Sequence, residues 1–101
     1  MNARDVVATV IGPDSRIAVL RKATWDHVLV AHPEMANRLS DVIATIERPE
    51  LREHDPRPGR SRSFRRCGPE RWLRVVIEFR GERDAVVTAF PQVNDPEGWQ
   101  R

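Results

Sequence analysis

The sequence of 101 residues has one cysteine, one lysine and no tyrosine. A single cysteine, Cys67, excludes an intramolecular disulfide and therefore the class of small secreted domains held together by such bonds. Apolar runs are at most four or five residues long, too short to span a membrane. A secretory signal would consist of a basic segment followed by an apolar stretch, and we see no such pattern. We therefore expect a cytoplasmic protein with no membrane partner.

The length and composition indicate one domain, residues 1–101. Hydrophobic residues make up 40% of the chain, which is enough for one modest core. No repeat and no linker composition divides the sequence.

The charge is unevenly distributed. The net charge is +2, but the segment from Pro56 to Arg74 has seven arginines and one acid, a formal charge of +6, whereas the rest of the chain has −4. Arginine has a planar guanidinium group that suits bidentate contacts with phosphate. The Arg57–Arg74 basic window therefore indicates a polyanionic partner. A general preference for arginine over lysine on solvated surfaces is the alternative, since sixteen of the seventeen basic residues are arginine.

The first half of the chain predicts a hairpin followed by two helices. Strand patterns at Val6–Ile11 and Arg16–Leu20 are separated by turn residues. Thr24 is a candidate N-cap for a short helix over Trp25–Ala31. Pro33 fits the first position of a second helix, whose apolar stripe runs to about Arg48.

The second half predicts antiparallel strands. The clearest strand is Trp72–Phe79, where Leu73, Val75 and Ile77 share one face, and Ala85–Phe90 is its partner. A short strand at Leu51–Asp55 and a weakly alternating one at Ser61–Cys67 precede them. This order predicts an α+β fold with an N-terminal β-hairpin and two helices packed on one face of a four-stranded antiparallel sheet. The other face would be open, lined by arginines, and available to a ligand. Trp99 should dock on the domain.

The histidines are the first candidates for chemistry. His27 and His32 flank a break at Pro33, and two imidazoles at such a corner could act as general base and general acid. Five residues along a straight helix would instead place them about 140° apart, and structural roles are the alternative.

Thr88 could hydrogen-bond a ligand, or its hydroxyl could be hydrogen-bonded within its own strand. Phe64 could stack on a base or belong to the core. No zinc-ligand spacing and no nucleotide-binding motif is present, so we expect neither a metal nor a cofactor.

The order of these motifs resembles the phage- and prophage-associated nuclease-like domains of the barnase–EndoU–colicin–RelE group (the BECR fold). The resemblance runs from about Val6 to Trp99 and is carried by these segments: Trp25-Asp26-His27-Val28, His32-Pro33-Glu34-Met35, Ile46-Glu47-Arg48-Pro49-Glu50, Ser63-Phe64-Arg65-Arg66, Val86-Val87-Thr88-Ala89-Phe90 and Gly98-Trp99. It implies a metal-independent endoribonuclease, often a toxin or effector, that acts on transfer or messenger RNA. An antitoxin or immunity protein is then an expected partner.

The resemblance matches His27, His32, Thr88 and either Arg65 or Arg66 to site positions of the group. We expect His27, His32, Arg65 and Thr88 to be catalytic. Four further residues are expected to bind the substrate: Arg62, Arg66, Arg74 and Phe64. Related sequences often have tyrosine at the positions of Phe64 and Phe90, so any role of a phenolic hydroxyl is missing here.

Two alternatives remain open at this stage. One is a catalytically inactive module that binds nucleic acid or an acidic partner through the basic window. The other is a small structural or regulatory subunit, with Trp25, Trp72 or Trp99 at a protein interface.

Overall fold

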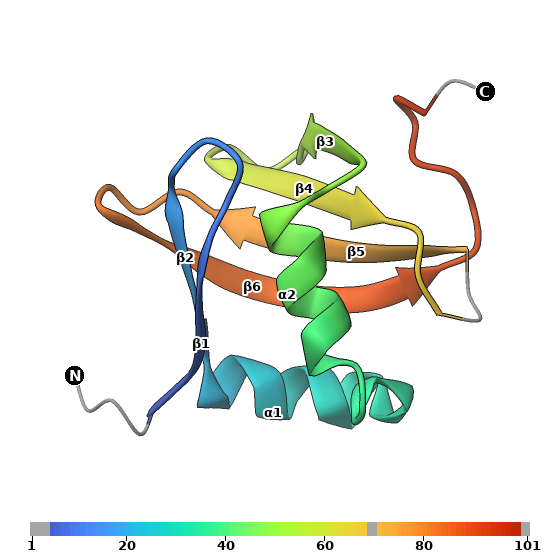
Figure 1. Cartoon of the computed structure of the whole chain (residues 1–101), viewed down its shortest axis with the longest axis horizontal. Helices are drawn as coiled ribbons and strands as arrows, with labels where there is room; N and C mark the ends of the chain where they lie inside the picture. Colours follow the sequence, from blue (N-terminus) through green and yellow to red (C-terminus); the bar gives the residue numbers. More distant parts are fainter. Residues whose placement is uncertain (1–4, 69–70, 100–101) are drawn as a thin grey trace.

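The computed structural model describes residues 5–68 and 71–99. Its elements in the described residues are β1 (Val6–Ile11), β2 (Ile17–Arg21), α1 (Lys22–Ala31), the 3₁₀ turn η2 (Pro33–Met35), α2 (Leu39–Glu47), β3 (Leu51–His54), β4 (Arg60–Arg65), β5 (Trp72–Glu78) and β6 (Arg83–Gln92). The predicted α+β class and the predicted order of elements are confirmed (Figure 1).

The sheet is larger than predicted, with six strands in the order β1-β2-β6-β5-β4-β3. The N-terminal hairpin is part of this sheet, because Ile17–Val19 of β2 pairs in parallel with Arg83–Ala85 at the start of β6. All other neighbouring strands are antiparallel. The predicted four-stranded antiparallel sheet is therefore wrong in strand number and direction. A parallel contact between distant segments leaves no local pattern in the sequence, which explains the error.

Both helices begin at residues other than those that the sequence predicted. Helix α1 begins at Lys22, directly after β2, and no side chain caps it, so Thr24 is not the N-cap. The second helix is interrupted, because η2 is followed by an irregular stretch before α2 begins at Leu39. Arg38 explains this stretch: its buried side chain donates to the Cys67 carbonyl at 2.9 Å and pairs with Asp41 at 3.1 Å. This tertiary anchoring sets the position where α2 starts.

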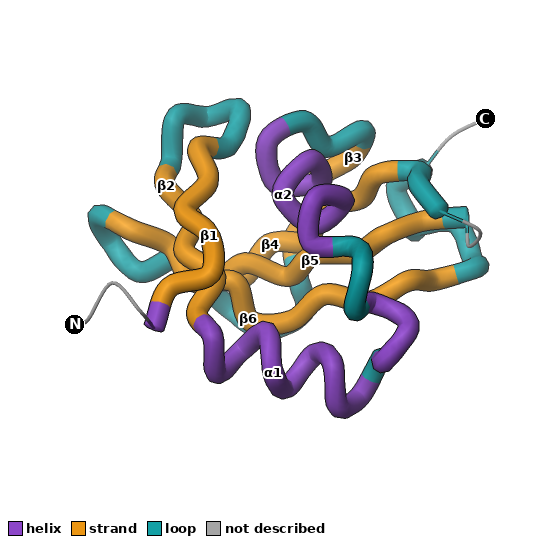
Figure 2. The backbone as a smooth tube through the Cα atoms, turned by 60° about the horizontal axis from the view of Figure 1, so that its bottom comes forward, coloured by secondary structure: helices purple, strands orange, loops and turns teal. Residues whose placement is uncertain are grey.

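The core lies between the helices and one face of the sheet. Helix α2 crosses β4 and β5, whereas α1 runs along β6 beyond the end of β2 (Figures 1 and 2). The predicted alternation in β5 is confirmed, since Leu73, Val75 and Ile77 face the helix-side core. Trp72, Arg74 and Val76 consequently face the other way. We call this second side of β4, β5 and β6 the open face.

The segment after β6 covers one end of the open face. The Trp99 ring packs edge-on against Trp72 with centroids 4.9 Å apart, and the Trp72 Nε1–H donates to Asp95 at 2.9 Å. Trp72 is completely buried as a result. The prediction that Trp99 docks on the domain is confirmed, and the remainder of the open face is uncovered near Arg74.

Candidate phosphate-binding site on the open face

Arg74 occupies the middle of β5 on the open face. Its guanidinium carbon lies 5.3 Å from the Phe64 ring centroid and 5.2 Å from the Phe90 ring centroid. Such contacts hold a cation in place through the negative faces of the rings. Among the described residues no carboxylate pairs with Arg74, and its Nε is buried with no hydrogen-bond acceptor. Arg74 is therefore a positioned cation without an internal anion.

The environment of Arg74 disfavours its own charge. Burial lowers the pKa of the Arg74 guanidinium, and the positive charge of Arg62 lowers it further, whereas the charges of Glu53 and Asp55 raise it. Arginine nevertheless stays protonated in proteins. A half-buried cation without an ion pair gains from a bound anion, because the anion would supply the charge partner that the described residues do not supply at ion-pair distance.

A cavity of about 390 Å³ lies over Arg74. Its polar lining comes from Arg62 on β4, Thr88 on β6 and the loop after β3, and Val76, Val87 and Phe90 form its apolar wall. Thr88 lies opposite Val76 in the β5–β6 register, so its position in the cavity follows from strand pairing. The lining contains four arginines, Arg57, Arg60, Arg62 and Arg74, together with the Thr88 hydroxyl and the Asp55 carboxylate.

Most of the other arginines in the basic window already have acidic partners. Arg62 pairs with Asp55 at 2.9 Å and Glu53 at 3.4 Å. Arg60, Arg66 and Arg71 pair with Glu78, Glu50 and Asp95 at 2.9, 3.4 and 3.3 Å. The one acid inside the window, Glu70, lies outside the described residues. Four arginines of the window are thus paired by strand and tail neighbours, whereas Arg57, Arg65 and Arg74 form no ion pair with a described residue. Arg57 and Arg74 both line the cavity, and of these two only Arg74 is held between aromatic rings.

His32 reaches the rim of this site. It follows the last residue of α1, where Pro33 prevents the helix from continuing. The imidazole stacks on the Phe90 ring with centroids 5.5 Å apart and an interplanar angle of 21°. Glu34 Oε1 lies 4.0 Å from His32 Nδ1, close enough to pair with a protonated imidazole. Phe90 therefore contacts both Arg74 and His32 and links the histidine to the cavity.

His27 does not join His32. It lies on the exposed side of α1, does not line the cavity over Arg74, and makes no ring contact or hydrogen bond with any described residue. The helix continues unbroken between the two histidines as far as Ala31, so the expected rotation keeps them apart. Neither histidine lines the cavity, but His32 stacks on Phe90, which does.

The remaining candidates divide between the two sides of the sheet. Arg65 points away from the open face and donates to the Arg48 carbonyl at 2.8 Å, at the C-terminal end of α2. Arg66 lies over the Trp99 ring at 4.8 Å. Phe64 is completely buried and offers no free ring face to a base; it supports Arg74 instead.

Phe90 and Asp55 both line the site, and neither was predicted as a site residue. The sequence placed Phe90 at the end of a predicted strand and Asp55 at the end of another. The strand alternation could have identified Phe90, because it is two residues after Thr88 and therefore on the same face. Asp55 depends on the approach of the β3–β4 loop, for which the sequence has no local signal.

No cluster of histidine, cysteine or acidic side chains within residues 5–68 and 71–99 has the geometry to hold a metal ion. In the same part of the chain, no helix has the length and apolarity needed to cross a membrane. No protein-family model matches the sequence, and comparisons with curated proteins and with solved structures found no match either.

Proposed function

We propose that the protein is a metal-independent endoribonuclease that holds a phosphodiester of RNA at Arg74 and uses His32 for proton transfer. The observation that carries this proposal is Arg74 itself, a positioned cation with a buried, unused donor at the floor of a cavity. Transfer or messenger RNA is the expected substrate. The proposal retains membership of the barnase–EndoU–colicin–RelE group, and with it an antitoxin or immunity protein as a partner.

The proposed reaction is a transphosphorylation. The ribose 2′-hydroxyl attacks the adjacent phosphorus, the bond from phosphorus to the 5′-oxygen breaks, and a 2′,3′-cyclic phosphate forms. His32 takes the proton of the 2′-hydroxyl, and solvent supplies the proton that the leaving 5′-oxygen needs. Arg74 neutralises the charge that develops on the non-bridging oxygens, to which Thr88 donates a hydrogen bond. Positioned charges of this kind commonly make the largest contribution to catalysis.

His32 is better suited than Asp55 to act as the base. Asp55 lines the same cavity, but hydrogen bonds from the Arg57 amide and the Arg62 side chain hold the pKa of its carboxyl below the ordinary value. A carboxylate stabilised in this way accepts a proton poorly near neutral pH. Histidine is the side-chain type that exchanges protons most readily in that range.

Charge pairing favours a focused site over a broad polyanion surface. A module that binds through the whole basic window needs several arginines free at once, whereas Arg60, Arg62, Arg66 and Arg71 are paired. A single phosphate needs only Arg74 and its cavity. This is why we rank the enzyme above the binding module.

The proposal is tested by incubating end-labelled RNA with the protein in EDTA. The wild-type protein should produce fragments with 2′,3′-cyclic phosphate ends. His32→Ala should lower the rate by about 10²- to 10⁴-fold, the usual contribution of one acid or base. His27→Ala is the matched control on the same helix and should cleave at the wild-type rate. If His27→Ala instead abolished cleavage and His32→Ala did not, the proposed assignment would be wrong.

The second candidate is an RNA-binding module without turnover. It is favoured by the presence of only one histidine at the site and by Phe64 and Phe90 where related sequences often have tyrosine. In that case RNA would remain intact with every variant, and binding would still depend on Arg74.

A further inference from the structure

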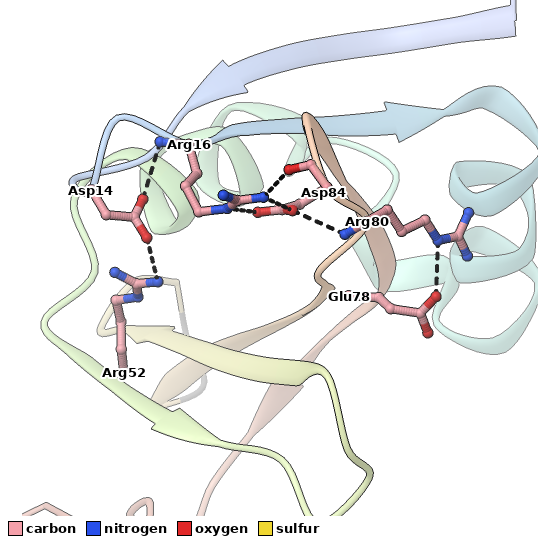
Figure 3. Close-up of polar contacts among 7 residues, drawn as sticks. Asp14, Arg16, Arg52, Glu78, Arg80 and Asp84 are labelled. Atoms are coloured by element: carbon pink, nitrogen blue, oxygen red, sulfur yellow. Dashed lines mark hydrogen bonds and ion pairs between the residues drawn. The ribbon is translucent and has the colours of Figure 1, made fainter.

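A second cavity, of about 380 Å³, is lined by Ile46 of α2 and by Ser61 and Ser63 of β4, which alternate with the open-face residues of that strand, so it lies on the helix side of the sheet. The hairpin turn that includes Asp14, the strands β3 and β4, and the turn between β5 and β6 surround it. Figure 3 shows how polar contacts join these segments: Arg52 reaches from β3 to Asp14, where they pair at 3.1 Å, and Arg16 reaches to Asp84. The nuclease proposal leaves this cavity without a role.

The cavity wall contains an exposed aromatic ring. Phe79 is 59% exposed, whereas the other five phenylalanine and tryptophan side chains are buried or half-buried. Its surface position is fixed, because the Arg16 guanidinium carbon lies 4.1 Å from its ring centroid. An aromatic ring held at the edge of a cavity costs free energy through its contact with water, and a ligand that covers it recovers that cost.

Arg16 is itself held rigidly. Its Nε and one terminal nitrogen donate to the two carboxylate oxygens of Asp84, each at 2.8 Å, and the same terminal nitrogen contacts the Gly81 carbonyl. The Arg80 amide donates to Asp84 at 3.2 Å and fixes the carboxylate in turn (Figure 3). Arg16 thus covers one face of the Phe79 ring and holds it in place, and the exposed part of this stacked pair is available to a further planar group.

The rest of the lining provides donors and an apolar floor. Ala18, Ile46 and Ile77 form the floor, and Ser61 and Arg52 lie at its sides. Arg52 uses one N–H for Asp14, which leaves its other donors without a partner among the described residues. A planar ligand that is rich in acceptors fits this combination, and nucleobases have both properties.

Arg60 connects the two cavities, because it lines both of them. The strand β4 begins at Arg60, directly after the loop that borders the cavity over Arg74. An RNA strand that leaves Arg74 on the open face would therefore pass around the start of β4 at Arg60 to reach Phe79 on the helix side.

We propose that Phe79 and Arg16 form a stacking site for a nucleobase of the same RNA strand whose phosphate binds at Arg74. The ligand of the second cavity is thus a single unpaired base. This inference rests on the proposed function for the identity of the strand, and base stacking itself needs no catalysis.

The test uses a non-cleavable, 2′-O-methyl single-stranded RNA whose bases are removed one position at a time. With the wild-type protein, removing one particular base should weaken binding by about 5- to 150-fold, the usual range for a stacked base. In Phe79→Ala the intact RNA should bind more weakly by a similar factor, and removal of that base should have no further effect. Phe79→Tyr should restore wild-type affinity. Ile11→Ala, which shortens another exposed apolar side chain, is the matched control and should bind as the wild type does.

The two proposals fail in different ways. If Phe79→Ala and Ile11→Ala bound the intact RNA equally, the stacking site would be overturned and the nuclease proposal would stand. A second outcome is that removal of the base weakens RNA binding only in proteins that contain Phe79, while Arg74→Met binds RNA as the wild type does. This outcome would support the stacking site and overturn the phosphate site. Thermal unfolding of each variant confirms that the fold is intact.

Discussion

Arg16 and Arg74 each place a guanidinium group against a phenylalanine ring, but the charges around the two groups differ. Arg16 stacks on Phe79 and forms a bidentate pair with Asp84, whereas Arg74 lies between two rings and has no carboxylate partner. The pair with Asp84 uses the charge of Arg16 to join the hairpin to β6. The charge of Arg74 is left for a ligand. The presence or absence of an ion pair therefore decides whether the charge of an arginine is used within the fold or is left for a ligand.

The largest expected effect is on the stability of the fold, which substitution of Arg16 should lower and substitution of Arg74 should leave nearly unchanged. Arg16→Ala should lower the free energy of unfolding by more than Arg74→Met does, because it leaves the buried Asp84 carboxylate without its charged donor. Arg74→Met, which keeps an apolar chain between the rings and removes the unpartnered donor, should change it by less than about 1 kcal/mol. Urea unfolding measures both values. Equal losses would remove the distinction on which the site assignment depends.

The acid dependence of stability should also follow the Arg16–Asp84 pair. Hydrogen bonds from Arg16 lower the pKa of the folded Asp84 carboxyl below its unfolded value. The resulting stabilisation is fully present above the unfolded value, near pH 4, and is lost as the pH falls through the lowered folded pKa. Asp84→Asn should therefore show a shallower loss of unfolding free energy below pH 4 than the wild type, by up to about 2 kcal/mol. Parallel curves for the two proteins would contradict this assignment.

The smallest expected effect concerns salt. If Arg74 carries the phosphate contact alone or with Arg62, the logarithm of RNA affinity should fall with the logarithm of salt concentration with a slope of about −0.7 to −1.4. If all seven arginines of the basic window contacted phosphates, the slope would be about −5. A titration of non-cleavable RNA between low and physiological salt separates the two. A steep slope would favour the binding module.

The sequence predicted the local features of this fold well. The period-two pattern of β5 assigned Leu73 and Arg74 to opposite faces, because alternation depends only on backbone geometry. The parallel β2–β6 contact and the break before α2 were missed. Both depend on partners far along the chain, such as Cys67 for Arg38, which no periodicity reveals.

The candidate site was predicted in part. Strand alternation and the resemblance named Arg74, Thr88 and His32, which the fold brings near one another through Phe90. His27 and Arg65 were named with them but lie elsewhere. Spacing along the chain cannot tell which arginines are neutralised, because the acids that pair with them come from other strands. The absence of such a pair, together with the two aromatic rings around it, is what sets Arg74 apart from the rest of the basic window.

The most direct test of this account is the binding of a 2′-O-methyl single-stranded RNA to Arg74→Met and Arg83→Ala, followed by fluorescence anisotropy. Both substitutions remove one positive charge, but Arg83 is exposed at the start of β6, away from the cavity. We predict that Arg74→Met weakens binding by about tenfold or more, since a hydrogen bond to a charged group contributes about 1.5–3 kcal/mol, and that Arg83→Ala has little effect. Equal affinities for the two variants would contradict the claim that Arg74 holds the phosphate.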